Sequence, residues 1–163
     1  MEIVQDDLSG AEVRSLIEEH LRHMASLSPP ESTHALDVEK LRQPDVTFFS
    51  AWENGELLGI GALKELDGGH GEIKSMRTAN GQHRKGVARS LLKRILEEAG
   101  HRGYRRVSLE TGARSIPAFH AAHALYESFG FRECGPFAAY WDDPNSLFMT
   151  LELSGTAEGK SVL

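Results

Sequence analysis

The middle of the chain carries the pattern that most constrains the fold: a strand, a glycine-containing turn, a long helix and a second strand. Residues 71–78 and 104–111 indicate strands, and residues 84–102 between them carry one apolar stripe at helical spacing. The stripe consists of Val87, Leu91, Leu92, Ile95, Leu96 and Ala99. A helix that joins two strands of one sheet in this way makes them parallel, with a right-handed crossover. The sequence therefore predicts a helix-covered sheet with at least one parallel strand pair.

The segments on either side of this unit indicate antiparallel strands and further helices. Residues 46–52 and 56–66 indicate two strands joined at Asn54-Gly55, which is typical of a tight hairpin turn, and Asp67-Gly68-Gly69 marks a second turn. The other expected elements are a strand over residues 2–5, a helix capped by Ser9 that breaks at Ser28, helices over 34–42 and 117–129, and strands over 131–135 and 147–153. Together they predict an α/β fold with a mixed, mostly antiparallel central sheet and helices on both faces.

Length and charge limit the classes of protein to consider. The 163 residues suit one domain, which we expect over residues 1–153, followed by a flexible tail over 154–163. The balance of 18 Lys and Arg against 24 Asp and Glu gives a formal charge of −6, which weighs against general nucleic-acid binding. No apolar run reaches the length of a membrane span, and the first residues lack the layout of a signal peptide.

The single cysteine, Cys134, allows no internal disulfide, so we expect a soluble protein of a reducing compartment, the cytoplasm. A buried small residue is favoured for Cys134 over a nucleophile. The pairs His20/His23 and His120/His123 have a spacing that metal ligands can use, but no carboxylate or cysteine completes either set. Packing or solvated histidines are therefore favoured, and no metal is expected.

The turn before the long helix carries the clearest chemical signal. The first N–H groups of a helix have no partner within it, and the helix dipole adds positive charge at that end. Gly86 lets a ligand approach the main chain closely, and Arg84, Lys85 and Arg89 add cations. The turn predicts a phosphate or pyrophosphate site; the alternative is a solvated basic helix start. It matches neither a Walker A loop nor Gly-x-Gly-x-x-Gly.

Residues 83–88, His-Arg-Lys-Gly-Val-Ala, resemble the Gln/Arg-x-x-Gly-x-Gly/Ala signature of the Gcn5-related N-acetyltransferase (GNAT) family from its second position onward. His83 stands where the family carries Gln or Arg. Residues 124–131, Ala-Leu-Tyr-Glu-Ser-Phe-Gly-Phe, are similar to the family's Leu-Tyr-x-x-x-Gly-Phe segment. The order of elements also matches over about residues 2–153, so the chain looks like a small bacterial member with the GNAT, or acyl-CoA N-acyltransferase, fold.

The resemblance implies acetyl-CoA as cosubstrate. Its pyrophosphate would bind main-chain N–H groups of residues 85–88, and its pantetheine arm would lie along Met76 and Thr78 like an added strand. The cofactor-binding residues implied in this way are Met76, Arg77, Thr78, His83, Arg84, Lys85, Gly86, Val87, Ala88 and Arg89. Family members usually have a bulge in this strand that opens a V-shaped slot. The glycines Gly59 and Gly61 in the neighbouring strand are compatible with such an irregularity.

Acetyl transfer to an amine needs a base, an oxyanion donor and a proton for the leaving thiolate. The resemblance implies Glu72 as the base, with a solvated strand residue as the alternative, and the Met76 N–H as the oxyanion donor. It implies Tyr126 as the acid, with a core aromatic as the alternative. The implied activity is N-acetylation of a primary amine by direct attack in a ternary complex. A non-catalytic acyl-CoA-binding module, another acyl chain or a hydroxyl acceptor remain alternatives.

The acceptor is expected to be a small-molecule or peptide amine, with neither a nucleic acid nor a membrane as partner. The resemblance implies that residues 26–34 and 140–143 overhang the acceptor, with Tyr140 and Trp141 as substrate-binding residues. The acidic residues that follow can attract a cationic amine, although a simple turn over 142–146 is favoured. Phe119 stands where relatives often carry Asn, a role that His120 can take. Relatives often dimerise, so a homodimer is an open alternative.

Overall fold

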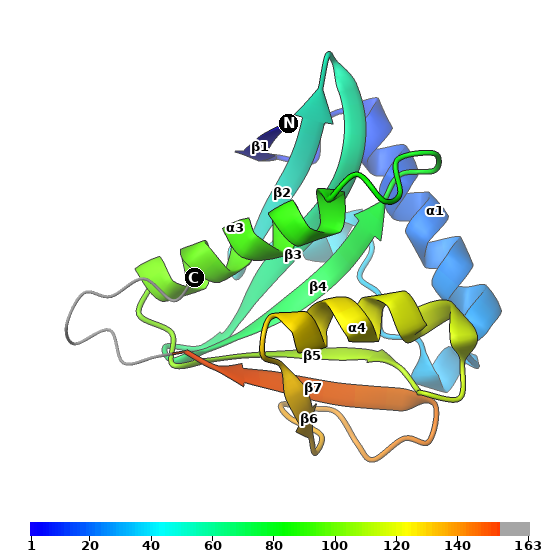
Figure 1. The fold of residues 1–163 in the computed structure, drawn as a ribbon, viewed down its shortest axis with the longest axis vertical. Helices are drawn as coiled ribbons and strands as arrows, with labels where there is room; N and C mark the ends of the chain where they lie inside the picture. Colours follow the sequence, from blue (N-terminus) through cyan, green and yellow to red (C-terminus); the bar gives the residue numbers. More distant parts are fainter. Residues whose placement is uncertain (154–163) are drawn as a thin grey trace.

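The computed structural model describes residues 1–153 and contains one seven-stranded sheet with the order β1-β2-β3-β4-β5-β7-β6 (Figure 1). The strands are β1 (Glu2–Gln5), β2 (Val46–Glu53), β3 (Glu56–Asp67), β4 (His70–Thr78), β5 (Arg106–Gly112), β6 (Arg132–Cys134) and β7 (Ser146–Glu152). Only the β4–β5 pair is parallel; the other neighbours are antiparallel. The predicted mixed, mostly antiparallel sheet is confirmed.

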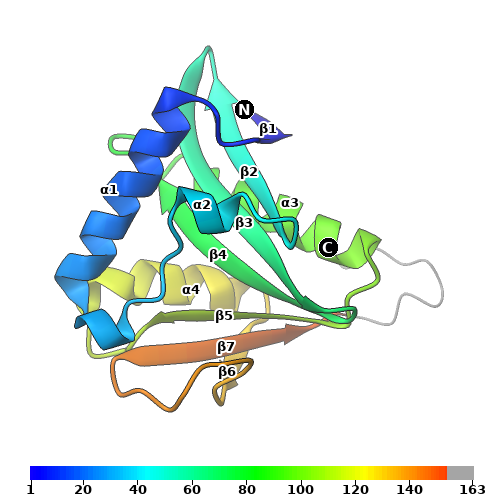
Figure 2. The ribbon, with the colours of Figure 1, turned by 180° about the vertical axis from the view of Figure 1, so that it is seen from behind.

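The helices cover both faces of the sheet, as predicted. They are α1 (Ala11–Leu27), α2 (Val38–Leu41), α3 (Val87–His101) and α4 (His120–Ser128), with 3₁₀ turns at Pro30–Ser32 and Pro117–Phe119. Helices α3 and α4 lie on the face seen in Figure 1, whereas α1 and α2 lie on the face seen in Figure 2. Across residues 1–153, no helix is both long and apolar enough to cross a membrane. The predicted tail over 154–163 lies outside the described residues.

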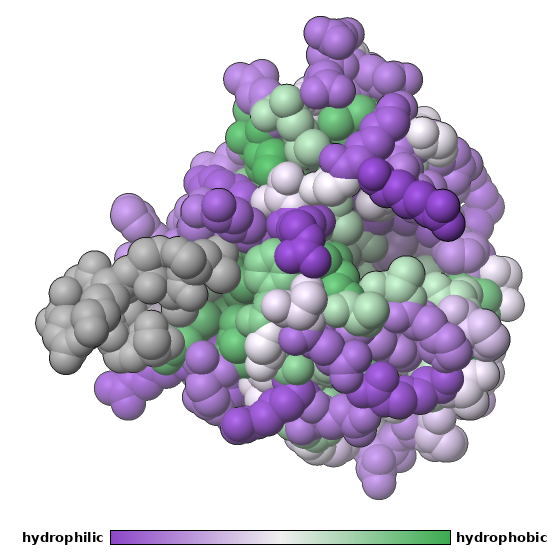
Figure 3. Space-filling model, viewed as in Figure 1, coloured by the Kyte–Doolittle hydropathy of each residue, from purple (hydrophilic) through white to green (hydrophobic). Residues whose placement is uncertain are grey.

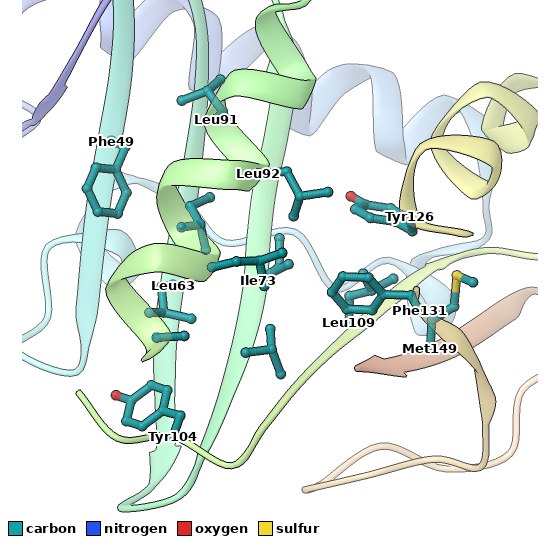
Figure 4. Packing of buried hydrophobic residues seen from close by; sticks show 14 of the residues in the cluster. Phe49, Leu63, Ile73, Leu91, Leu92, Tyr104, Leu109, Tyr126, Phe131 and Met149 are labelled. Atoms are coloured by element: carbon teal, nitrogen blue, oxygen red, sulfur yellow. The ribbon is translucent and has the colours of Figure 1, made fainter. Parts of the chain in front are cut away.

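Each face has its own core. The apolar stripe of α3 is 0–2 % exposed and packs on Phe49, Leu63 and Ile73 of the sheet (Figure 4). The opposite core joins α1 and α2 to Phe48 and Ile60. Burial of a large apolar side chain contributes roughly 1.5–3 kcal/mol, so the α3 stripe alone is a major source of stability. Phe48 and Phe49 face different cores because successive side chains of a strand point to opposite faces of the sheet.

Three predicted helix starts differ from the observed ones by one to four residues; helix α2 begins at Val38 rather than at His34. The N-cap of α1 is Gly10, and the Ser9 hydroxyl donates to Asp7 Oδ1 at 2.6 Å instead of capping the helix. Helix α3 begins at Val87 rather than at Arg84, because Arg84 and Gly86 adopt φ angles of +67° and +78° that a right-handed helix excludes. The turn before α3 is therefore longer than the apolar pattern indicated.

A bulge interrupts β4 where it faces Gly61. Ile60 of β3 pairs with Arg77, and Ala62 pairs with Lys74, so two residues of β4, Ser75 and Met76, stand opposite one residue of β3. Ser75 has a φ of +57°. A Cβ on Gly61 would stand 2.6 Å from the Met76 sulfur, so a side chain at position 61 would displace Met76. The expected irregularity beside the strand glycines is present.

Strands β4 and β5 part soon after they begin. Their parallel pairing covers only residues 70–72 and 106–108, whereas β5 stays paired with β7 along its whole length. Figure 1 shows β4 rising away from β5 toward the turn before α3. The sheet is thus split on one side, and the bulge of β4 lies on the edge of the split.

Candidate functional site

A cavity of about 350 Å³ lies where β4 and β5 part. Its walls come from residues 73–78 of β4, residues 110–112 of β5, α4, and on the other side α1 with the segment after it. Figure 3 views the α3–α4 face, where apolar side chains occupy the surface between the two helices and polar side chains surround them. Because α4 and α1 lie on opposite faces of the sheet and both contribute to the walls, the cavity is lined by side chains from both faces.

The turn before α3 exposes main-chain amides at the edge of this cavity. At the start of α3, the N–H of Ser90 donates to the main-chain oxygen of Gly86 at 3.0 Å, which is the first hydrogen bond of the helix. The three N–H groups before it have no acceptor within the helix. Gly86 caps α3 without a side-chain hydrogen bond, and a Cβ placed on it would meet nothing within 4 Å. The geometry fits the predicted anion site.

The basic side chains of this turn have different surroundings. Lys85 Nζ donates to Gln82 Oε1 at 2.9 Å, within the turn itself. Arg89 donates to Ser128 Oγ at 3.1 Å and lies over the Phe129 ring, which ties α3 to the end of α4. Arg84 has no hydrogen-bond or ion-pair partner among residues 1–153. Arg84 is therefore the cation of this turn with the fewest competing contacts.

Five of the predicted cofactor-binding residues line the cavity: Met76, Arg77, Thr78, His83 and Ala88. The others, Arg84 to Val87 and Arg89, belong to the turn and the first turn of α3. Ser75 and Met76 lie in the bulge, and neither has a partner in the pairing with β3 or with β5. Main-chain groups of β4 are therefore available beside the cavity, as an added strand requires.

Tyr126 of α4 is both a core aromatic and a residue of the cavity wall. Its ring belongs to the core and packs edge-on against Phe131 with centroids 5.7 Å apart, yet the residue also lines the cavity. Figure 4 shows the side chain reaching from α4 toward α3. Burial raises the pKa of this phenol well above its ordinary value, so it keeps its proton at neutral pH. A protonated hydroxyl at the cavity can donate to a leaving group.

The carboxylate of Glu72 is buried, 3 % exposed, and is already bonded to other side chains. Its Oε2 accepts from the Tyr140 hydroxyl at 2.5 Å and from Lys74 Nζ at 3.3 Å. Lys74 also donates to the Tyr140 hydroxyl and to the His34 oxygen. Glu72 is not among the residues that line the cavity. Its role as the base stays a prediction.

Glu110 of β5 is a second carboxyl that the sequence interpretation did not single out. It lines the cavity, and Ser146 Oγ donates to its Oε2 at 2.7 Å. Burial raises the pKa of Glu110 to about 7; the Ser146 hydrogen bond and Lys74 lower it, and the nearby Glu72 charge adds to the increase. A carboxyl that titrates near neutral pH suits proton transfer at that pH. The sequence held one indication of this position: Glu110 follows the core residue Leu109 in a strand, so its side chain lies on the opposite face of the sheet.

The side of the cavity toward α1 is rich in imidazoles and cations. His20 is 8 % exposed, and burial, followed by the charge of Arg77, lowers its pKa to about 4. Arg77 donates to Glu19 Oε1 at 3.2 Å, and its other terminal nitrogen lies 2.6 Å from His23 Nδ1. His34 and Lys74 also line this side. Of the predicted pair His20/His23, His23 is thus joined to β4 through Arg77.

The predicted acceptor residues Tyr140 and Trp141 lie beside the cavity wall rather than in the lining. Both rings pack edge-on against His34, at centroid distances of 4.9 and 5.3 Å, and Trp141 is 52 % exposed. The expected turn is present, since Asp143 Oδ1 accepts from the Asn145 N–H at 2.8 Å. Their contact with an acceptor stays a prediction.

The remaining singled-out residues stabilise the loop before α4. His120 and His123 bond through Nε2 to the main-chain oxygens of Arg114 and Gly112, at 2.7 and 2.8 Å. Phe119 lies against Gly112, where a Cβ would overlap its ring. In the part of the chain that the structure describes, no group of three or more His, Cys, Asp or Glu is arranged to hold a metal ion. Cys134 is half-buried in β6.

Comparison with known proteins gives consistent matches. The family model described as the acetyltransferase (GNAT) family matches residues 13–131. The uncharacterised N-acetyltransferase YsnE of Bacillus subtilis (strain 168) is 61% identical over 94% of this chain and 100% of its own length. The uncharacterised N-acetyltransferase YedL of Escherichia coli (strain K12) is 52% identical over 93% of this chain and 94% of its own. A GNAT family acetyltransferase from Elizabethkingia anophelis with acetyl-CoA bound has a TM-score of 0.65 at 20% identity, covering 93% of this chain and 97% of that one.

Proposed function

Because the chain belongs to the GNAT family of acetyltransferases, we propose that it transfers the acetyl group of acetyl-CoA to a primary amine, by direct attack in a ternary complex. The observation that carries the proposal is the convergence on one cavity of the open helix start, the bulged β4, Tyr126 and Glu110. Acetyl-CoA supplies an activated thioester; the chain must bind it, accept a proton from the amine and protonate the thiolate.

For the coenzyme, we propose that the amides at the start of α3 bind the pyrophosphate and that Arg84 adds charge. The pantetheine arm then lies along Met76 and Thr78, in the split between β4 and β5. The free main chain of the bulge supports this arrangement, because an extended ligand needs unpaired N–H and C=O groups beside it. The Met76 N–H is the proposed donor to the developing oxyanion.

For the base, two carboxyls stand as candidates. A lysine-like amine has a pKa of about 10.4 and arrives mostly as ammonium, so a proton must be removed. We favour Glu110, because it lines the cavity and its pKa of about 7 leaves it able to accept a proton at neutral pH. Glu72, proposed from the sequence, does not line the cavity, and its Oε2 already accepts hydrogen bonds from Lys74 and Tyr140.

For the acid, we propose Tyr126, whose raised pKa keeps the proton that the thiolate requires. We retain Tyr140 and Trp141 as acceptor contacts, because both pack on His34, which lines the cavity. The cytoplasm remains the proposed compartment, on the basis of the single Cys134.

The test is release of free thiol from acetyl-CoA in the presence of amines of different charge, repeated with propionyl- and succinyl-CoA. We expect thiol release that depends on both the protein and an amine, together with binding of coenzyme A by calorimetry. Binding without thiol release from any amine would indicate a non-catalytic module. No binding of coenzyme A would overturn the proposal altogether.

A further inference from the structure

The α1 side of the cavity contains most of the buried side-chain atoms that lack a partner. Within residues 1–153, four buried side-chain nitrogen or oxygen atoms make no hydrogen bond, and three of them belong to cavity residues. These three are His20 Nδ1, Ser75 Oγ and Arg77 Nε. His20 and Ser75 are at least nine-tenths buried, with 8 % and 9 % of their surface exposed. A buried polar atom without a partner is destabilising, so three at one cavity point to a ligand that supplies the missing bonds.

The chemistry of these atoms defines what they bind. Arg77 Nε is a donor and never an acceptor, and a serine hydroxyl can donate in any direction. His20 is neutral at physiological pH, because its burial disfavours the charged form, so one of its two ring nitrogens carries a hydrogen. With the hydrogen of His20 on Nδ1, the three atoms together are donors that suit a group with several acceptor oxygens. A carboxylate, with two oxygens and about four lone-pair positions, meets that requirement.

The charges on this side agree with an anionic group. Arg77 and Lys74 line the cavity, whereas the carboxylates that pair with them, Glu19 and Glu72, do not. The terminal nitrogens of Arg77 are held by Glu19 and His23, which fixes the guanidinium and leaves Nε as the free donor. Figure 2 shows α1 running beside the free end of β4, the strand that carries these residues. The carboxyl group of the cavity, that of Glu110, comes from β5, the other strand of the split.

We propose that the amine acetylated here is an amino acid, whose carboxylate binds Arg77, Ser75 and His20 while its amino group lies at Glu110. The inference rests on the proposed acetyl transfer and specifies its acceptor. The two strands of the split then hold opposite charges of one zwitterion, anion on β4 and cation on β5. A polyamine, or an amine without an anionic group, leaves these three donors of α1 and β4 unpaired.

The test compares amino acids with their own carboxamides, for example alanine with alaninamide and methionine with methioninamide. Each pair keeps the side chain and replaces the charged carboxylate by a neutral carboxamide; because this also lowers the pKa of the amine, the rates are compared per concentration of free amine. We expect kcat/KM for the amino acid to exceed that for the carboxamide by about tenfold or more, since charged hydrogen bonds are at stake. Equal rates, or faster acetylation of the carboxamides, overturn the inference, as does turnover confined to polyamines.

The variant Arg77→Gln tests whether the preference for amino acids over carboxamides depends on the Arg77 side chain. We expect it to raise KM for amino acids about tenfold and to bring the ratio within each pair near one. Arg77→Lys, which keeps the charge but lacks the Nε donor, should restore part of the ratio. Arg132→Gln on β6, outside the cavity lining, is the matched control and should keep the wild-type ratio. Equal loss for both members of each pair in Arg77→Gln would contradict the proposed contact.

Binding separates this inference from the proposed function. Calorimetry with coenzyme A present measures amino acid and carboxamide binding whether or not any acetyl group is transferred. A carboxylate preference that Arg77→Gln abolishes supports the site even if no thiol is released, in which case only the proposed catalysis fails. Thiol release with no carboxylate preference in binding or turnover leaves the catalysis intact and overturns the site.

Discussion

The Ser146 hydroxyl of β7 donates a 2.7 Å hydrogen bond to the Glu110 carboxyl of β5, at the wall of the cavity. The bond joins two neighbouring strands whose pairing includes Glu110 with Phe148 and Gly112 with Ser146. It holds one oxygen of Glu110 in place. The carboxyl is therefore oriented by the paired side of β5, whereas the side facing β4 is unpaired beyond residue 108.

The first prediction concerns Glu110→Gln and the rate of acetyl transfer. The amide keeps the size of the side chain and an oxygen for the Ser146 bond, but cannot accept a proton. We expect kcat to fall about 10²-fold or more. In the wild type, kcat/KM should rise with pH through about 7 as Glu110 ionises, and this dependence should disappear in the variant. A pH–rate profile with the same rise in both proteins would exclude Glu110 as the base.

The second prediction concerns stability. The pKa of Glu110 rises from 4.5 to about 7 on folding, so the folded chain holds a proton that the unfolded chain releases above pH 4.5. The free energy of unfolding should therefore decrease as pH rises from about 4.5 to 7, by up to about 3 kcal/mol. Glu110→Gln removes this penalty.

Denaturant unfolding at pH 5 and pH 8 checks this directly. The variant should be more stable than the wild type at pH 8, with the difference shrinking toward pH 5. Glu97→Gln, on the exposed face of α3, is the control and should change little at either pH. A Glu110 variant less stable than wild type at pH 8 would mean that the carboxyl is not disfavoured by its surroundings.

The third prediction concerns Tyr126→Phe. The ring that packs on Phe131 is retained, so the free energy of unfolding should change by less than about 1 kcal/mol. The proton donor is lost, and kcat should fall about 10²-fold with little change in KM for acetyl-CoA. Tyr104→Phe, which loses the bond to Glu65 outside the cavity, is the matched control and should keep its kcat. Unchanged turnover in Tyr126→Phe would remove it as the acid.

The fourth prediction separates Glu72 from Glu110. Replacing Glu72 by Gln leaves the buried Lys74 ammonium without its counter-charge, which should cost about 3 kcal/mol of stability or more. The folded fraction should still show a rise of kcat/KM with pH, because Glu110 is intact, but at a lower pH than in the wild type, because the Glu72 charge that helps to raise the pKa of Glu110 is gone. Loss of that rise in Glu72→Gln, with its retention in Glu110→Gln, would restore the base predicted from the sequence.

The fifth prediction concerns the turn before α3. Gly86→Ala and Gly81→Ala both introduce a Cβ at a φ near +80°, with nothing within 4 Å, so both should lose about 1–2 kcal/mol of stability. Only Gly86 caps α3, so only Gly86→Ala should also weaken coenzyme A binding. Calorimetry of the two variants checks the difference. Equal affinity in both would argue against the proposed pyrophosphate site.

Apolar periodicity and turn residues predicted the elements that depend on interactions between residues close in the sequence. The α3 stripe and the Asn54-Gly55 hairpin are present because apolar period and turn chemistry act over a few residues. The N-cap at Ser9 was wrong because Asp7 competes for its hydroxyl. The start of α3 was misjudged because the backbone at Arg84 is left-handed, which no apolar pattern reports.

The site was less accessible from the sequence, because it depends on contacts between distant segments. Arg89 is hydrogen-bonded to Ser128, and Glu72 is hydrogen-bonded to Tyr140, 68 residues away. Glu110 lines a cavity only because β4 separates from β5. That separation follows from the bulge at Ser75 and from the pairing of β5 with β7. Strand period indicates which face a residue is on, but not where two strands part.

Acetyl transfer to an amine is tested most directly by mass spectrometry of an amine panel incubated with acetyl-CoA and the purified protein. We expect an acetylated amine whose formation matches the free thiol released, at wild-type rate with Arg132→Gln and at least about 10²-fold more slowly with Glu110→Gln. No acetylated amine with the wild-type protein, or equal product from wild type and Glu110→Gln, would contradict it.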